Sequence, residues 1–158
     1  MPFVDLRLDE VKIEKPKQVP AGDYTWQLLP VAQVRINKYT EQEELNLSAA
    51  IAEGEYAGRR EFWNYPDSTQ LSKNGKSMAW SAQAMKKLEL ALGVDCLPGE
   101  SAVDFFNRAA NSGANRFGAA LVDETRKDPA TNKYVPFIRT GETEPRTVLS
   151  IFSVHAAQ

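Results

Sequence analysis

The alternation of apolar and polar residues predicts that the first part of the chain folds into β-strands. Between residues 24 and 37 the even positions are mostly apolar and the odd positions mostly polar, with a bend expected at Pro30. Residues 45–51 repeat this period of two, and a tight connection at 53–55 would return the chain antiparallel over residues 56–65. Because a period of two places alternate side chains on opposite faces, three half-buried strands are expected.

The period then changes to that of a helix. Apolar residues recur every three or four positions between 77 and 92, and Gly93 provides a C-terminal stop. A second, shorter helix is expected from Ser101, whose hydroxyl can cap it, to about Ala110. Two helices therefore follow the three strands.

Strand character resumes after the second helix. Residues 116–126 and 134–140 read as strands joined by a polar loop, and residues 146–154 are rich in β-forming side chains. This order of elements is that of an OB-fold, a five-stranded, partly open barrel with its helix between strands three and four. An α+β sandwich with the same order is the competing architecture. We expect an extended leader at residues 1–18 and one mainly β, OB-fold-like domain at residues 19–158.

Composition fits this picture. The chain has 158 residues, of which 42% are hydrophobic and 25% charged, as in single globular domains. No apolar run reaches the roughly 18 residues of a membrane-spanning helix, and the N-terminus lacks the pattern of a signal peptide. Cys96 is the only cysteine and cannot form an internal disulfide. We therefore expect a cytoplasmic protein that does not enter a membrane.

The charge argues against a uniformly basic nucleic-acid binder, because the formal net charge is −2 and the pI is about 5.5. The distribution of charge matters more than the total. Most cations fall in or beside predicted strands, whereas many carboxylates gather in the first third of the chain. A basic groove on an acidic protein is compatible with this distribution.

Residues 58–65, GRREFWNY, combine two arginines and three aromatic residues in one predicted strand. Alternation predicts Arg59, Trp63 and Tyr65 on one exposed face and Phe62 in the core. A cation beside flat rings is the combination that holds single-stranded nucleic acid. An ordinary strand with one buried face gives the same pattern, because aromatic residues favour strands whatever they bind.

Further basic and aromatic residues fall where an OB-fold binds its ligand, on its second and third strands and in the loops joining strands one to two and four to five. The candidate nucleic-acid-binding residues are Arg35, Lys38, Tyr39, Arg59, Arg60, Trp63, Tyr65, Arg126, Lys127, Lys133, Tyr134 and Arg139. Of these, Lys38, Arg59, Arg60, Lys133 and Arg139 are expected to hold phosphates, and Tyr39, Trp63 and Tyr65 to stack on bases.

Catalysis and metal binding are not expected. His155 is the only histidine, so neither a catalytic triad nor a metal site has the residues it needs. The sequence KNGKS at 73–77 is similar to the end of a phosphate-binding P-loop, but Gln70 stands where that motif requires glycine. We expect no enzyme activity, no metal and no cofactor. An enzyme built on paired carboxylates is the weakest alternative.

Four short motifs complete the sequence picture: VPAGDY at 19–24, LNL at 45–47, YAGRR at 56–60 followed by an aromatic residue, and LALG at 90–93. Together they resemble a family of small bacteriophage proteins of unknown function associated with single-stranded DNA binding. The resemblance covers about Val19 to Arg139. It implies an OB-fold protein that coats single strands during phage replication or recombination in the host cytoplasm. Many such proteins end in an acidic tail, whereas this chain ends SIFSVHAAQ.

Two hypotheses follow for function. The first is a sequence-tolerant single-stranded DNA-binding protein, with phage or host replication proteins as further partners and a homo-oligomer compatible with it. The second is a phage protein–protein interaction module, such as a structural subunit or an inhibitor of a host enzyme. The acidic pI and the missing acidic tail motivate the second hypothesis.

Overall fold

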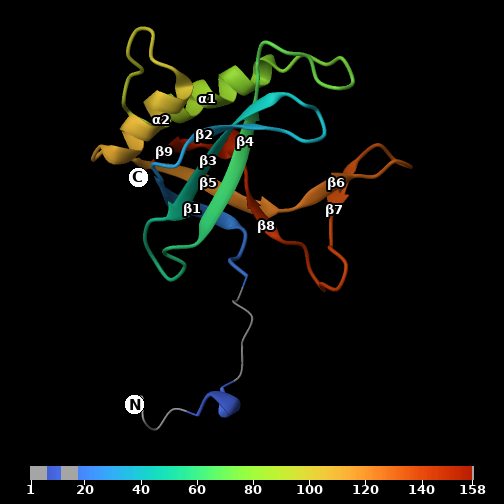
Figure 1. The fold of residues 1–158 in the computed structure, drawn as a ribbon. Helices are drawn as coiled ribbons and strands as arrows, with labels where there is room; N and C mark the ends of the chain where they lie inside the picture. Colours follow the sequence, from blue (N-terminus) through green and yellow to red (C-terminus); the bar gives the residue numbers. More distant parts are fainter. Residues whose placement is uncertain (1–6, 12–17, 158) are drawn as a thin grey trace.

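The computed structural model describes residues 7–11 and 18–157, so most of the expected leader lies outside the described residues. Within the leader, Leu8–Glu10 forms a short 3₁₀ helix, η2. The body consists of an antiparallel sheet, a separate hairpin and two helices, drawn in Figure 1. The prediction of a mainly β chain with two helices is confirmed.

The first predicted strand is one bent strand in two halves, β1 (Gly22–Leu28) and β2 (Gln33–Ile36). Both halves pair antiparallel with the same edge of β3 (Glu43–Ile51). Leu28 lies opposite Ala49 and Gln33 opposite Asn46, so the bent strand holds two more residues than β3 between these pairs. The extra residues bulge out of the ladder at Pro30, as the sequence predicts.

Four further strands complete the sheet around β1 and β3. β4 (Arg60–Pro66) pairs along the other edge of β3, and β5 (Arg116–Asp123) along the other edge of β1. β8 (Thr147–Leu149) and β9 (His155–Ala156) pair with the far edge of β5. β6 (Thr125–Lys127) and β7 (Tyr134–Pro136) form the separate hairpin.

The prediction of a five-stranded barrel was wrong in strand number and in closure. The described chain has nine strands, partly because the first strand is broken at its bulge and the last is interrupted by the 3₁₀ helix η3 (Ile151–Ser153). Among the described strands, β4 and β8 approach each other without pairing, so the sheet stays open between them.

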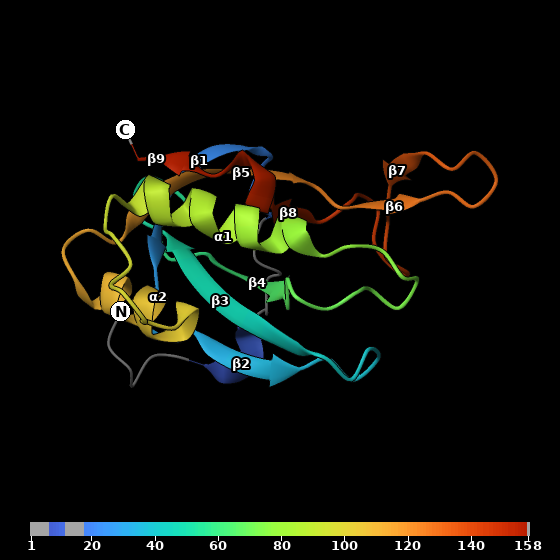
Figure 2. The same ribbon diagram turned by 90° about the horizontal axis from the view of Figure 1, so that it is seen from above.

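Both helices match the prediction closely. α1 (Ala79–Leu92) ends at Gly93, which adopts the left-handed conformation with φ 71° that glycine tolerates best. α2 (Ala102–Asn111) begins after Ser101, whose Oγ accepts a hydrogen bond of 3.1 Å from the Asp104 N–H. Figure 2 shows α1 lying along the sheet, where it packs against β4, β5 and β9.

The inward sides of the sheet and the two helices form one apolar core. Its largest fully buried side chains include Trp26, Tyr65, Phe106, Phe117, Leu28, Leu47 and Leu88. Trp26 and Phe117 lie opposite each other on β1 and β5. No helix in the described part of the chain is long and apolar enough to cross a membrane.

Candidate nucleic-acid interface

The side chains of β4 face the opposite way from the prediction. Trp63 and Tyr65 are only 8% and 1% exposed, whereas Phe62 is 62% exposed. Trp63 lies opposite Leu47 on β3 and packs its ring edge-on against Phe117, at 6.2 Å between centroids. Burial also raises the pKa of Tyr65 to about 12. The predictions that Trp63 and Tyr65 stack on bases and that Phe62 lies in the core were therefore wrong.

The outward side chains of β4 and its neighbours form one polar surface, which we call the outer face. Residues directly opposite each other in adjacent strands share a face of the sheet, so the register defines the members of this surface. They are Gln27, Gln33, Arg35, Asn46, Ser48, Arg60, Phe62, Asn64 and Arg116.

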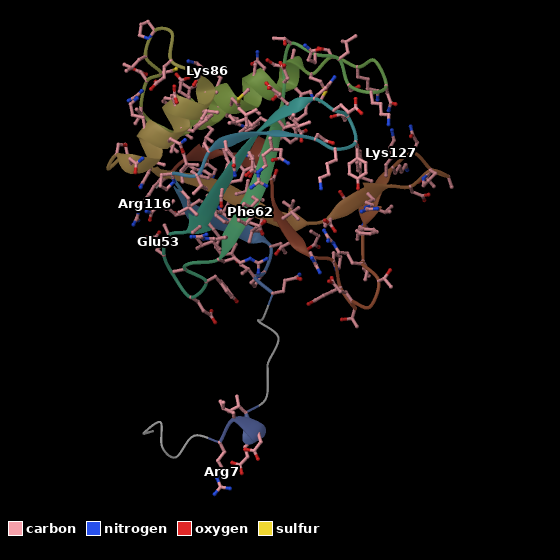
Figure 3. The ribbon with its side chains drawn as sticks, in the orientation of Figure 1. Arg7, Glu53, Phe62, Lys86, Arg116 and Lys127 are labelled. Atoms are coloured by element: carbon pink, nitrogen blue, oxygen red, sulfur yellow. The ribbon has the colours of Figure 1, made fainter. Side chains whose placement is uncertain are left out.

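The first row of the outer face crosses four strands. Arg60 on β4 lies opposite Ala50, Ala50 lies opposite Gln27, and Gln27 lies opposite Arg116 on β5. An arginine therefore stands at each end of the row, with a small residue and an amide between them. The Arg116 guanidinium lies 3.7 Å from the Glu53 carboxylate. Figure 3 shows this pair at the margin of the sheet and Phe62 on β4.

The second row contains the exposed aromatic ring. Phe62 lies opposite Ser48, which is 1% exposed and whose Oγ has no hydrogen-bond partner among the described residues. A ring that is 62% exposed beside so small a side chain is open to a flat ligand. The Ser48 hydroxyl itself is buried, so the exposed Phe62 ring is the group that a ligand can contact in this row.

The remaining rows are built of amides and one more arginine. Asn64, Asn46 and Gln33 lie side by side on β4, β3 and β2, and the Asn46 Nδ2 donates to the Asn64 Oδ1 at 2.7 Å. Arg35 follows on β2, and its guanidinium donates to the Gln33 amide oxygen when that amide is oriented to receive it. Glu44 lies opposite Arg35 and accepts from Asn37 at 3.0 Å.

The turn between β2 and β3 follows the strand that carries Arg35. Lys38 is exposed in this turn, and Tyr39 is 87% exposed. The Asn37 Oδ1 accepts hydrogen bonds from the backbone N–H groups of Tyr39 and Thr40, at 2.8 and 3.2 Å, and so shapes the turn. The structure thus places Lys38 and Tyr39 in the exposed turn that follows the strand of Arg35.

The β6–β7 hairpin holds the other predicted residues at a separate place. Lys127 and Tyr134 lie opposite each other in it, and Tyr134 is 72% exposed. The Arg126 guanidinium lies over the Phe137 ring, 3.9 Å from its centroid. Figures 1 and 2 show the hairpin projecting on the same side of the molecule as the β2–β3 turn, with the loop between β4 and α1 between them in Figure 2.

Two predicted phosphate-binding arginines are engaged by carboxylates. Arg139 donates to both oxygens of Glu124, from Nε at 3.0 Å and from Nη2 at 2.9 Å, and these bonds lower the pKa of Glu124. Arg59, which directly precedes β4, lies 3.6 Å from Glu61. Lys133 is exposed at the start of β7, next to Tyr134.

Several residues of the outer face were not predicted as binding residues: Gln27, Gln33, Asn46, Ser48, Phe62, Asn64 and Arg116. Their common property is a shared face, which depends on the pairing of β4 with β3 and of β1 with β5. Within the described residues, no group of three or more His, Cys, Asp or Glu side chains is placed to hold a metal ion. Comparisons with protein-family models, with curated proteins and with solved structures found no match for this chain.

Proposed function

We propose that this protein binds single-stranded DNA, with little sequence preference, across the outer face. The observation that carries the proposal is the exposed Phe62 ring on β4, at the edge of a polar sheet surface that also carries Arg60, Arg35 and Arg116. A ring supplies a stacking platform for any base, and each guanidinium can hold a phosphate.

The chemistry of the outer face suits a polyanion. Its other exposed polar groups are the uncharged amides of Gln27, Gln33 and Asn64, which can hydrogen-bond to bases or phosphates without repelling them. Of the carboxylates that adjoin the outer face, Glu53 is paired with Arg116, whereas Glu44 accepts a hydrogen bond from the uncharged Asn37 amide and lies opposite Arg35. Arg60 and Lys38 supply the positive charge that is left for a polyanion.

The arrangement of elements supports the finer assignment to an OB-fold-like architecture. A bent first strand pairs with a long second strand, a third strand returns along it, and a helix follows before the next strand of the sheet. In such folds the face of strands two and three binds single strands. Here those strands are β3 and β4, which carry Ser48 and Phe62. We extend the proposal to a role in phage replication or recombination, on the resemblance of the sequence motifs.

Titration of fluorescently labelled oligothymidine against the protein tests this function. With Arg35, Arg60 and Lys38 in contact with phosphates, the logarithm of the association constant should fall with log salt by a slope of about 2. Duplex DNA of the same length should bind more weakly, since its bases are not free to stack on Phe62. Absence of binding at low salt would overturn the proposal. An affinity that does not change with salt concentration would mean that the arginines do not bind phosphates.

A further inference from the structure

The side of the sheet that carries the outer face continues for one more row beyond Arg116. Arg116 and Gly118 are two residues apart on β5, so they share a side of the sheet. Gly118 lies opposite Thr25 on β1 and opposite His155 on β9. We call these three residues the Gly118 row. The row ends in the His155 ring, at the other edge of the sheet from Phe62.

The His155 ring lies flat over Gly118. A Cβ atom at Gly118 would overlap Cε1 of the ring and would lie only 2.6 and 2.7 Å from Nδ1 and Nε2. A ring that met the glycine edge-on would bring Cε1 alone this close. One face of the imidazole therefore rests on the glycine backbone, where any side chain would displace it. The His155 side chain is nevertheless 45% exposed, so it is open to a ligand.

A hollow of about 320 Å³ lies beside this ring, which is enough for a small planar ligand. Its lining combines the ring, the bare glycine, hydroxyl groups and two carboxylates. The lining residues are Asp23, Tyr24, Thr25, Glu53, Gly118 and His155. Figure 3 shows Glu53 beside Arg116 at the margin of the sheet, whereas Phe62 lies on β4.

The two carboxylates keep their capacity to accept hydrogen bonds. The Asp23 carboxylate lies 3.8 Å from the His155 Nε2, and the Glu53 carboxylate lies 3.7 Å from the Arg116 guanidinium. Both distances are longer than a hydrogen bond. A pair of carboxylates repels phosphate but accepts from an amino group. A base edge that carries such a group is therefore the part of a nucleic acid that this hollow fits.

We infer that the Gly118 row takes one base of the bound strand, stacks it on His155 and favours a base with an exocyclic amino group over thymine. Cytosine, adenine and guanine carry such a group, whereas thymine presents the O4 acceptor, which the carboxylates would repel. The inference rests on the proposed function and adds one selective position to a site that otherwise tolerates any sequence.

The two rings would hold different nucleotides of one strand. From β4 to β9 the sheet order has four strand spacings, through β3, β1 and β5, which is about 19 Å. Phe62 would thus stack on a base at one end of the site and His155 on a base at the other. Selectivity is therefore expected at one end of the bound strand and not along its whole length.

Fluorescence titration at low salt, with oligothymidine of eight nucleotides and with strands in which one thymine is replaced by cytosine, tests the inference. The wild type should bind about 5- to 10-fold more tightly when the cytosine lies near one end, as one hydrogen bond to a charged group would give. D23N/E53Q should bind both kinds of strand equally. D9N/E10Q, which removes two negative charges from exposed residues of η2, should keep the wild-type preference.

His155 is tested by the loss and by the retention of its ring. H155A should weaken binding of every strand by at least about fivefold, because a stacked base loses its platform. H155F, which keeps a flat ring, should bind oligothymidine as the wild type does.

Three results would overturn the inference and leave the proposed function intact: a wild type that binds all strands equally, an H155A variant that binds as the wild type does, or a cytosine preference that persists in D23N/E53Q. Absence of binding to every oligonucleotide would instead overturn the proposed function, and the inference with it.

Discussion

Phe62 and Trp63 are neighbours in β4, yet the Phe62 side chain is 62% exposed and the Trp63 side chain 8%. In this strand the exposed ring is available for binding, and the buried ring contributes to stability. Trp63 packs against Phe117 and lies opposite Leu47, inside the core, whereas Phe62 lies on the outer face opposite Ser48. Substitution of each ring should therefore have a different effect.

Phe62→Ala should weaken binding of oligothymidine by about 5- to 150-fold, because loss of one base–aromatic stack costs about 1–3 kcal/mol. Its free energy of unfolding should change little, since the ring is exposed. Trp63→Ala should instead lower the free energy of unfolding by about 3–5 kcal/mol, as removal of a large core ring does. Fluorescence titration measures the first effect and denaturant unfolding the second.

Phe152→Ala is the matched control for Phe62→Ala, because Phe152 is 65% exposed but lies away from the outer face. With an oligonucleotide of about eight nucleotides, short enough for a single copy, this variant should bind as the wild type does. Equal affinity of Phe62→Ala and Phe152→Ala would show that Phe62 does not stack on a base.

Arg60→Gln should reduce the salt dependence of binding, because Arg60 is exposed on the outer face next to Phe62. Each lost phosphate contact lowers the slope of log K against log salt by about 0.7 for a single strand. Arg139→Gln should leave the slope unchanged, since both oxygens of Glu124 already hold that guanidinium. If Arg139→Gln lowered the slope and Arg60→Gln left it unchanged, the DNA would lie on the β6–β7 side of the molecule. Titrations over a series of salt concentrations measure both slopes.

The helix ends and the strand bend were predictable because local chemistry determines them. Pro30 cannot donate to a ladder, Gly93 tolerates a left-handed conformation, and the Ser101 hydroxyl caps a helix start whatever surrounds it. These positions were identified correctly because each depends on neighbours within a few residues.

Which side chains of β4 point into the core was not predictable in the same way. Both alternating sets in GRREFWNY contain aromatic and polar residues, so periodicity shows which side chains share a face but not which face is buried. The choice follows from pairing with β3, where Trp63 meets Leu47. Val34 and Ile36 also occupy the even positions of their strand, which the alternation predicts to be buried, yet they are 52% and 68% exposed.

Glu61→Gln should stabilise the protein relative to the wild type, increasingly as the pH rises above the ordinary glutamate pKa of 4.5. Burial raises the pKa of Glu61, and Arg59, at 3.6 Å, offsets this only in part. Below pH 4.5 the carboxyl is protonated in both folded and unfolded chains. As the pH rises, the unfolded chain ionises first, so wild-type stability falls until the folded pKa is passed.

Denaturant unfolding of both proteins between pH 3.5 and neutral pH measures this difference. A Glu61→Gln advantage that is already complete at the lowest pH would mean that it arises from packing rather than ionisation. Arg59→Gln is the companion variant. It should raise the pKa of Glu61 further and widen the pH interval over which stability is lost.

Glu100→Gln should have the opposite pH dependence. The Arg108 guanidinium donates to both oxygens of Glu100, at 2.8 and 2.9 Å, and the Leu97 N–H donates at 3.1 Å, which lowers the pKa of Glu100 to about 2. A lowered folded pKa gives stability that is complete above the ordinary value of 4.5 and is lost as the pH falls toward 2. Wild type should thus be the more stable protein at neutral pH, and its advantage should shrink over this acidic interval. Thermal unfolding of both proteins at pH 7, 4.5 and 2.5 measures this difference in stability. If wild type were more stable than Glu100→Gln by the same amount at pH 2.5 as at pH 7, ionisation of Glu100 would not be the source of the difference.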